Sequence, residues 1–226
     1  MTVYTTKPAI NLREELASLR NQGGYSEQQF YFDGLVTNGT FDADTTGWVV
    51  RSGCTISAVG GRLRLTATGT AAMRAYTTIS TEIGKVYEIK ITGFNLSGAQ
   101  PAVYFQLGGG GSNIDTATLL DGSEISLTVT ATSTTHRVEI GNSGANTVSS
   151  FMEADNISVF EVDANGDVIH TMPKGWKPKD VFEDGLLQRE GAANDYTVVY
   201  DGFDYYVKPT VAPSATTQTC VIGVRA

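Results

Sequence analysis

Four stretches of this chain alternate apolar and polar side chains with a period of two. They are RLRL at 62–65, YEIKI at 87–91, VYFQL at 103–107 and ISLTVTA at 125–131. A strand with this pattern turns one face toward a core and the other toward water. The segments between the stretches are rich in Gly, Ser, Thr and Asn, which turns require. The pattern predicts an all-β fold in which two sheets pack as a sandwich.

The composition agrees with this fold class and excludes several functions. Of the 226 residues, 41% are hydrophobic and 18% charged, which is typical of a turn-rich globular protein. With a formal net charge of −8 the chain gains little from phosphate contacts, so nucleic acid is not expected as a partner. Because the sequence has no apolar run of about 18 residues, membrane insertion is not expected. Residues 1–8 lack the apolar core of a secretion leader. Cys54 and Cys220 lie far apart, and we expect two buried thiols rather than a disulfide.

Five short phrases between residues 36 and 162 occur in a set order and spacing. They are NGTFD at 38–42, GW at 47–48, GGRL at 60–63, GKVY at 84–87 and DNISV at 155–159. In this order the phrases resemble the jelly-roll carbohydrate-binding modules that accompany bacterial cellulases and xylanases. The resemblance implies a jelly-roll β-sandwich over residues 36–162 that can present a sugar-binding face. It also implies that Trp48 belongs to the core.

A sugar-binding face needs aromatic rings for stacking, and amide, guanidinium or carboxylate groups for hydroxyls. Alternation turns Tyr104 and Gln106 outward in one predicted strand, and Arg74 and Tyr76 outward in another. If the two strands share a sheet, these four side chains form one carbohydrate-binding patch. The alternative is that they are ordinary solvent-side strand residues, since tyrosine favours strands.

Two aspartates are candidate ligands for a structural calcium ion, the one cofactor that the resemblance implies. Modules of the resembled group often hold calcium between the opening and closing phrases, and Asp42 and Asp155 stand at the matching positions. Oxygen ligands suit that ion. The group more often has a glutamate where Asp42 stands, and Asp155 has the alternative role of anchoring a turn. The segment DANGD at 163–167 is interpreted as an Asn-Gly hairpin turn rather than a calcium loop.

Residues 1–35 are predicted to form a docking arm with a short helix. An N-cap asparagine and a capping-box glutamate open the helix, and Leu12, Leu16 and Leu19 recur at helical spacing. A helix of about ten residues is too short to be stable alone in water. We therefore expect the three leucines to form an assembly interface, with residues 23–34 as a tether.

The end of the chain is predicted to be a linker followed by a small β-module. Residues 163–179 comprise the hairpin turn and a linker with two prolines, and the module covers residues 180–226. In the module, Asp201-Gly202 lies between two β-rich runs, which is a strong signal for a two-residue hairpin turn.

The sequence of this last module resembles a small β-module that recurs in tailed-phage structural proteins. The shared features are FEDGLL at 182–187, DYT at 195–197, AP at 212–213 and a final apolar strand at 220–224. The resemblance implies a component of a virion.

No catalytic constellation is evident in the sequence, so an enzyme is not expected. His136 and His170 have no Cys or His neighbours at ligand spacing, and no Gly-x-Ser-x-Gly motif occurs. A hydrolytic tail spike would need a pair of carboxylates in a cleft, and none can be identified.

These observations favour a structural protein on the exterior of a tailed-phage particle, as a capsid decoration, head fibre or tail fibre component. We expect it to be made in the host cytoplasm and to reside in the virion. Its expected partners are other virion proteins and sister subunits, with at most weak glycan adhesion to the host surface. The alternative from a different class is a carbohydrate-binding accessory module of a glycan-degrading system, which predicts a leader or a catalytic partner domain.

Overall fold

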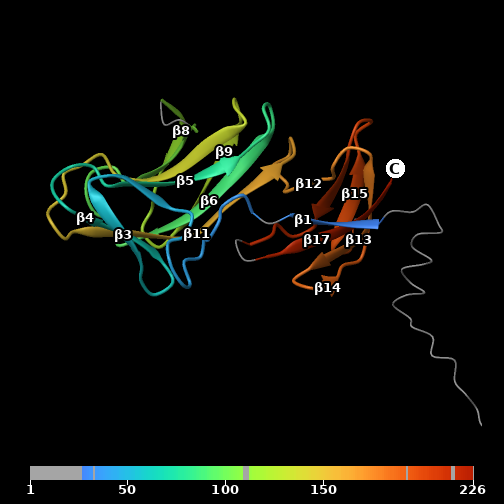
Figure 1. The fold of residues 1–226 in the computed structure, drawn as a ribbon, viewed down its shortest axis with the longest axis horizontal. Coiled ribbons are helices and arrows are strands. Elements are labelled where there is room, and N and C mark those ends of the chain that lie inside the picture. Colours follow the sequence, from blue (N-terminus) through green and yellow to red (C-terminus); the bar gives the residue numbers. More distant parts are fainter. Residues whose placement is uncertain (1–26, 33, 109–111, 192, 215–216, 226) are drawn as a thin grey trace, which may run out of the picture.

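The chain folds into two β-structured units. The computed structural model describes residues 27–32, 34–108, 112–191, 193–214 and 217–225. In these residues the regular structure consists of strands without an α-helix, so the all-β prediction is confirmed for them. No helix there is long and apolar enough to cross a membrane. The predicted helix with Leu12, Leu16 and Leu19 lies outside the described residues. Figure 1 shows the two units one after the other along the long axis.

The first unit is a β-sandwich of two antiparallel sheets. One sheet has the strand order β2-β5-β10-β7-β8 and the other β3-β4-β11-β6-β9. The chain crosses repeatedly from one sheet to the other, so many paired strands are distant in sequence, as in a jelly roll. The strands of the first sheet are β2 (Val49–Ser52), β5 (Arg74–Ser80), β10 (Thr135–Gly141), β7 (Ala102–Leu107) and β8 (Asn113–Thr118). Those of the second are β3 (Cys54–Ala58), β4 (Leu63–Ala67), β11 (Phe151–Val162), β6 (Val86–Phe94) and β9 (Glu124–Thr130).

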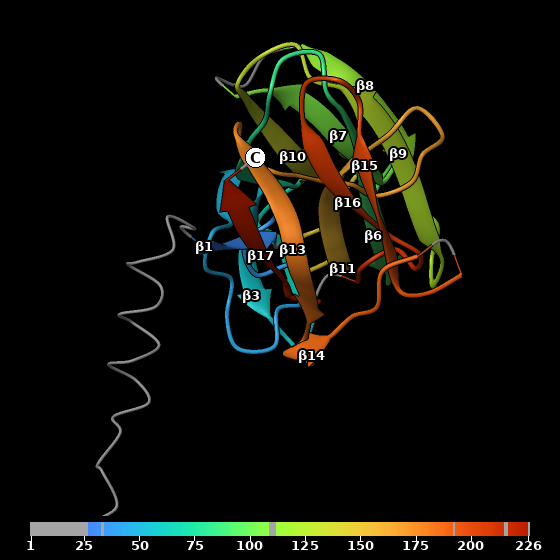
Figure 2. The same cartoon turned by 90° about the vertical axis from the view of Figure 1, so that its right-hand side faces the viewer.

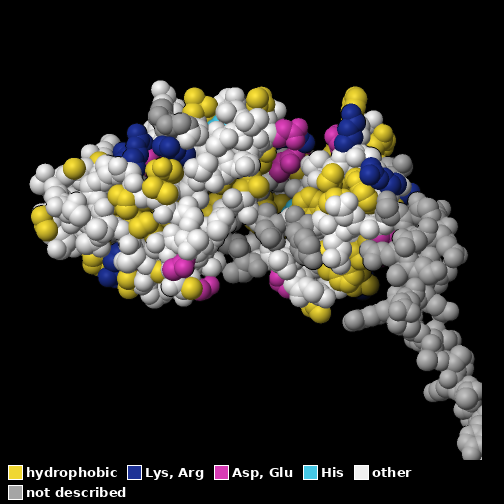
Figure 3. Space-filling view, in the orientation of Figure 1, with side chains coloured by type: hydrophobic (Ala, Val, Ile, Leu, Met, Phe, Trp, Pro, Cys, Tyr) yellow, Lys and Arg dark blue, Asp and Glu magenta, His cyan; other side chains and the backbone are white. Residues whose placement is uncertain are grey.

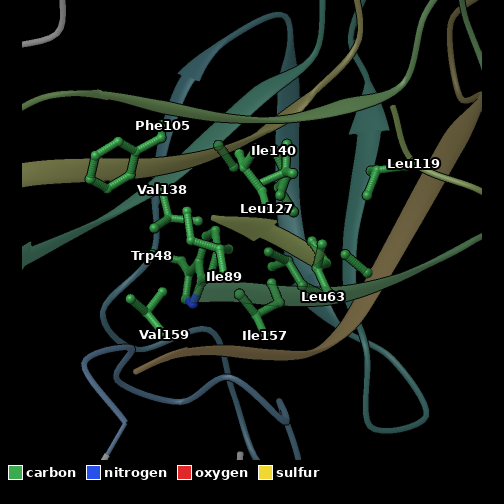
Figure 4. Packing of buried hydrophobic residues seen from close by; sticks show 14 of the residues in the cluster. Trp48, Leu63, Ile89, Phe105, Leu119, Leu127, Val138, Ile140, Ile157 and Val159 are labelled. Carbon is green, nitrogen blue, oxygen red and sulfur yellow. The ribbon is translucent and has the colours of Figure 1, made fainter. Parts of the chain in front are cut away.

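Side chains from both sheets meet in one hydrophobic core. Figure 4 shows Leu63, Ile89 and Val138 among the side chains that fill the space between the sheets. In β4, Leu63 and Leu65 have no exposed surface, whereas Arg64 between them is half-buried on the outer face. The period-two pattern of the sequence thus marks the strands of the sandwich correctly. Burial of each such large apolar side chain contributes about 1.5–3 kcal/mol to stability.

The opening and closing phrases of the sandwich lie side by side. The N–H of Ile157 donates a hydrogen bond to the carbonyl oxygen of Gly39 over 2.9 Å. Only glycine fits at position 39, because a Cβ atom there would lie 2.0 Å from the carbonyl oxygen of Ile157. Trp48 is 6% exposed and packs against Phe41 with a centroid distance of 5.6 Å. The predicted core position of Trp48 is therefore confirmed.

The acidic segment after β11 is a hairpin turn, as predicted. The N–H of Gly166 donates to the carbonyl oxygen of Asp163 over 3.0 Å. The ammonium group of Lys208 bridges the two aspartates, at 3.0 Å from Asp163 and 2.5 Å from Asp167. Because the ammonium group of Lys208 lies between the two carboxylates, the segment does not resemble a calcium loop.

The second unit, the C-terminal β-unit, consists of two smaller sheets. Their strand orders are β1-β17-β13-β14 and β12-β16-β15, and Figure 2 views the molecule from this side. The strands are β1 (Glu27–Phe32), β12 (His170–Thr171), β13 (Trp176–Glu183), β14 (Leu186–Leu187), β15 (Tyr196–Tyr200), β16 (Tyr205–Pro209) and β17 (Thr219–Arg225). The unit has its own apolar cluster, formed by the buried side chains of Met172, Trp176, Val181, Tyr196, Val207 and Val221.

Two predicted boundaries differ from the structure. Residues 27–32, which were assigned to the docking arm, form β1 and pair with β17, with Phe30 opposite Val221. The predicted linker, 163–179, contains β12 and the first residues of β13. Pro178 lies where the register between β13 and β17 shifts, and a proline is tolerated at such an irregularity. The prolines therefore do not end the strand, and the C-terminal β-unit includes strands from both sides of the sandwich.

The hairpin of β15 and β16 is present, but its turn is longer than predicted. Tyr200 pairs with Tyr205, so residues 201–204 connect the strands and the predicted two-residue turn is wrong. The side-chain Oδ1 of Asp201 accepts hydrogen bonds from the N–H groups two and three residues later, over 2.8 and 2.9 Å. This bonding of an aspartate to its own backbone stabilises the longer loop.

The two units meet at an aromatic cluster around His170. Its ring stacks on Phe32 of β1 with a centroid distance of 5.1 Å, and lies edge-on to Phe160 of β11 at 6.4 Å. His170 is 4% exposed, and its Nε2 has no hydrogen-bond partner among the described residues. Burial lowers the pKa of His170 to about 4. The folded protein therefore holds this ring in the neutral form at neutral pH.

The buried His170 predicts a loss of stability in mild acid. Its pKa is about 6.5 in an unfolded chain and about 4 in the folded protein. The unfolded state therefore binds the proton first, and stability falls as the pH drops through this window. Between pH 7 and pH 5 this group should lower the free energy of unfolding by about 2 kcal/mol. Urea unfolding of the His170→Phe variant should lack that part of the loss, and equal losses in both proteins would contradict the assignment.

Candidate functional site

The four predicted sugar-binding residues share the outer face of one sheet, the face that points away from the core. Arg74 and Tyr76 lie on β5, and Tyr104 and Gln106 lie on β7. The two strands are not direct neighbours, because β10 lies between them. Glu139 of β10 pairs with Tyr76 on one side and with Tyr104 on the other. The structure thus brings the four residues together around a carboxylate that was not predicted.

Glu139 is the centre of this face and has no exposed surface. Nη1 of Arg51 lies 2.7 Å from its Oε2, and Nη1 of Arg74 lies 3.1 Å from its Oε1. Each carboxylate oxygen therefore accepts a hydrogen bond from a guanidinium group. Burial of a carboxylate is unfavourable unless it is paired in this way. The positions of the two arginines and of Glu139 therefore depend on one another.

Arginine side chains also cover the two tyrosine rings. The guanidinium carbon of Arg74 lies 4.0 Å from the ring centroid of Tyr104, and that of Arg137 lies 4.0 Å from the centroid of Tyr76. Tyr104 is only 8% exposed. Gly141 permits the first contact, since a Cβ atom there would lie 2.7 Å from Cδ of Arg74. The patch therefore differs from the expected open aromatic surface, because a cation–π contact covers one face of each ring.

A hollow of about 300 Å³ lies beside Glu139. Gln106 accepts a hydrogen bond from Nη1 of Arg51 over 3.2 Å and donates one to Oδ1 of Asn113 over 2.7 Å. The residues that line the hollow are Arg51, Ser52, Ala72, Arg74, Gln106 and Asn113. In Figure 3, Lys and Arg side chains gather at the upper left, near β5 and β8. We name as the Glu139 face the side chains of Arg51, Arg74, Tyr76, Tyr104, Gln106, Asn113, Arg137 and Glu139.

Sequence reasoning missed four members of the Glu139 face, namely Arg51, Asn113, Arg137 and Glu139. Arg137 and Glu139 stand at alternate positions of the run THRVEIG at 135–141, so the period of two could have placed both on the outer face. Arg51 and Asn113 each lie next to a shift in strand register. Alternation along one strand does not reveal such a shift, so the sequence carries no comparable signal for these two residues.

A second buried carboxylate, Glu153 of β11, organises the outer face of the opposite sheet. Its Oε1 lies 2.6 Å from Nη2 of Arg64, and its Oε2 lies 3.5 Å from Nη1 of Arg62. Asn95 donates to Oε2 over 2.7 Å. Burial opposes ionisation of Glu153, but the hydrogen bonds from Arg64 and Asn95 lower its pKa below the ordinary value. Arg64 also stacks over Phe151 at 4.2 Å. This Glu153 cluster is a structural counterpart of the Glu139 face on the other side of the sandwich.

The two candidate calcium ligands lie close enough for their charges to interact. Burial raises the pKa of Asp155, and the negative charge of Asp42 raises it further. A cation between the two carboxylates would relieve this repulsion. The nearby guanidinium of Arg62 already does so in part, because it lowers the same pKa. Among the described residues no group of three or more His, Cys, Asp or Glu side chains could hold a metal ion. Calcium takes about six to eight oxygen ligands, so backbone carbonyls and water would have to complete the site.

The histidines and Cys54 lie in the interior rather than on the Glu139 face, and Cys220 is half-buried in the C-terminal β-unit, so the prediction of two buried thiols is correct only for Cys54. His136 has no exposed surface, stacks on Phe105 at 4.5 Å and lies 2.7 Å from the hydroxyl oxygen of Thr81 through its Nδ1. Burial lowers the pKa of His136. Cys54 is buried and Cys220 is half-buried, and both are free thiols.

Comparison of the sequence with protein-family models and with curated proteins gives no match. Among solved structures, the sandwich is similar to one described as "CBM4 structure and function", with 15% identity, coverage of 56% of this chain and 99% of that one, and a TM-score of 0.42. It is also similar to the N-terminal cellulose-binding domain of Cellulomonas fimi β-1,4-glucanase C, with 16% identity, coverage of 57% and 97%, and a TM-score of 0.44. The enzymatically active domain of bacteriophage CBA120 tailspike protein 4 matches with 12% identity, coverage of 57% and 21%, and a TM-score of 0.41. The jelly-roll arrangement itself rests on the strand order and register of this chain.

Removal of the Glu139 charge should destabilise the sandwich. The substitution Glu139→Gln keeps the side-chain size but takes the charged acceptor from Arg51 and Arg74. We expect the free energy of unfolding to fall by about 2 kcal/mol in urea unfolding. The control is Glu124→Gln on β9, where the side chain is exposed and the change should stay within about 0.5 kcal/mol. Equal effects of the two substitutions would contradict the structural role of Glu139.

The calcium prediction can be tested by removal of the metal. If Asp42 and Asp155 hold an ion in the folded state only, the ion stabilises the protein by about 2.7 kcal/mol at a hundred times its Kd. A calcium chelator should then lower the melting temperature of the native protein and leave an Asp42→Asn, Asp155→Asn double variant unchanged. The same melting temperature with and without chelator would leave Asp155 as a turn residue.

Proposed function

We propose that this chain is a non-enzymatic glycan-binding protein whose ligand lies across β5, β10 and β7. The observation that carries the proposal is the Glu139 face, where guanidinium and amide groups from neighbouring strands converge at a hollow of about 300 Å³. Convergent polar groups in a hollow can fix the orientation of a polar ligand. The groups stand on strands of a sandwich with a filled core, which holds them in fixed positions.

The polar groups of the Glu139 face are suited to sugar hydroxyls. The side-chain amide of Gln106 is only 2% exposed and bonds Arg51 and Asn113, so it holds those two side chains in place. Asn113 is exposed, and its amide has both donor and acceptor atoms. Arg51 and Arg74 bond Glu139 through Nη1, and a guanidinium group has five N–H donors in all. Further donors of each arginine can therefore serve a ligand while Glu139 stays paired. Glu139 holds both arginines in position, so little side-chain freedom is lost on binding.

Loss of an aromatic ring from this face should weaken glycan binding. Tyr76 is half-buried and supports Arg137 through its ring. We expect Tyr76→Ala, alone and together with Tyr104→Ala, to weaken binding to any glycan that an array detects by at least about tenfold, or about 1.4 kcal/mol. Phe151→Ala is the matched control, because Phe151 has the same kind of contact with Arg64 on the opposite sheet. Unchanged binding by the double variant would rule out this face as the glycan site.

We further propose that the protein acts on the exterior of a tailed-phage particle, with the virion as its location and with virion proteins or sister subunits as partners. The support is the sequence pattern of the C-terminal β-unit and the Leu12, Leu16 and Leu19 stripe of the predicted arm. The segment 1–26 joins the C-terminal β-unit through β1 rather than the sandwich. Attachment through this end would leave the Glu139 face directed toward solvent. In the alternative, an accessory module of a glycan-degrading system, the same face would bind glycan without attachment to a particle.

A truncation separates attachment from folding. Because β1 begins at Glu27, the deletion should remove residues 1–26 and leave residues 27–35 in place. We expect the truncated protein to be folded by circular dichroism and to bind glycan as before, but to be missing from assembled particles. The measurement is its copy number in purified particles relative to the full chain. A copy number of the truncated protein equal to that of the full chain would contradict the role of the arm, and the C-terminal β-unit would then be the expected attachment site.

A further inference from the structure

The hollow beside Glu139 is lined by positive and neutral groups only. Its lining residues include two arginines, two amides and one hydroxyl, and no Asp or Glu. The carboxylate of Glu139 is the counter-charge of this region, and each of its oxygens is already bonded to one of the two arginines. Two guanidinium groups thus share one negative charge at the edge of the hollow, which leaves a surplus of positive charge.

A third arginine adds to this surplus. Arg137 lies on β10, two residues from Glu139, and its guanidinium stacks over Tyr76. Arg137 does not line the hollow, so it contributes through the attraction of its charge for an anionic ligand on the same face.

This surplus stands out against the rest of the chain. The formal net charge of the protein is −8, so the positive charge of the Glu139 face does not follow from the overall composition. The Glu153 cluster has the same Arg–Glu–Arg chemistry, yet Asn95 rather than a third arginine completes it. The Glu139 face thus has three arginines beside one carboxylate and the Glu153 cluster has two, so the Glu139 face carries one more positive charge, although the central carboxylates are paired alike.

We infer that the Glu139 face binds an acidic polysaccharide, with an anionic group of one sugar unit between Arg51 and Arg74. The inference rests on the proposed glycan-binding function of this face and adds the class of its ligand. A guanidinium group can donate two parallel N–H bonds to two oxygens of a carboxylate or of a sulfate. An arginine covers one face of the Tyr76 ring and one face of the Tyr104 ring, and Tyr104 is only 8% exposed, so stacking of a neutral sugar has little room. Charge recognition is what this geometry favours.

The test compares polysaccharides that share a backbone and differ in charge. One pair is polygalacturonate and its methyl ester, and the other is a sulfated galactan and its desulfated form. Affinity of the full chain for each is measured by affinity electrophoresis at low and high salt. We expect the charged member of at least one pair to bind at least about tenfold more tightly, a difference of about 1.4 kcal/mol, and expect this preference to shrink as salt screens the charges. Preference within the first pair identifies a carboxylate, and preference within the second identifies a sulfate.

Substitutions of single arginines show which residues cause the preference for the charged polysaccharide. Arg51→Gln and Arg74→Gln should each reduce it by about tenfold. Arg137→Gln should also reduce it, and because this substitution leaves both ion pairs of Glu139 intact, it separates the effect of charge from disruption of the Glu139 pairs. Arg64→Gln, which removes an arginine from the Glu153 cluster, is the matched control and should keep the preference.

Three results would overturn the inference. Equal binding of both members of each pair would overturn it and leave the glycan-binding function standing. Failure to bind any of the four polysaccharides would overturn the inference, and absence of binding to every glycan on an array would overturn the proposed function as well. A preference that survives Arg51→Gln and Arg74→Gln but is lost in Arg64→Gln would place the anion site on the opposite sheet.

Discussion

The buried carboxylate of Glu139 organises the outer face of the β2-β5-β10-β7-β8 sheet, on which we propose that the ligand binds. It has no exposed surface and is paired with arginines from β2 and β5, while its own strand, β10, lies between β5 and β7. Because an unpaired charge in such a place is strongly unfavourable, the carboxylate fixes the two guanidinium groups before any ligand arrives. Arg51 extends the network to Gln106 on β7, and Gln106 extends it to Asn113 on β8. One ionised group thus positions polar side chains across the whole sheet.

The arrangement of this face follows from the sandwich beneath it. The core side chains of the two sheets fill one space, so the strands cannot shift without loss of packing. The fixed strands in turn fix the positions of the side chains on the outer face. The tyrosine rings that a sugar could have stacked on are covered by Arg74 and Arg137. The face therefore offers guanidinium and amide groups in place of bare rings. In the Glu153 cluster, a buried glutamate paired with two arginines stabilises the other sheet in the same way. The Glu139 face differs from that cluster in its hollow and in its surplus of positive charge.

Local patterns in the sequence predicted much of this fold and only part of the site. Alternation correctly turned Arg74, Tyr76, Tyr104 and Gln106 outward, because the direction of a side chain depends on its own strand. It could not show that β10, which is distant in sequence, lies between the two strands and brings Glu139 with it. Which strands pair in a jelly roll depends on tertiary contacts between segments that are distant in sequence, and the pattern along a single strand does not reveal them.

The errors at the ends of the chain have similar causes. Residues 27–32 are a short β-rich segment whose partner, β17, lies at the other end of the sequence, so local sequence alone predicts a tether there. Pro178 predicts a break in regular structure, but a register shift accommodates it within β13. Asp201-Gly202 predicts a two-residue turn, but the side chain of Asp201 bonds the following backbone and lengthens the loop. In each case a contact made after folding overrode the local signal.

A chemical-shift titration can show whether glycan binds on the Glu139 face. Backbone amide resonances of the full chain are followed by NMR while an oligosaccharide from a glycan that the protein binds is added. We expect the largest shifts at β5, β7 and β10, around Tyr76, Tyr104 and Glu139, and little change at the amides around Glu153 and in the C-terminal β-unit. Shifts centred on the opposite sheet or on the C-terminal β-unit would show that glycan binds elsewhere.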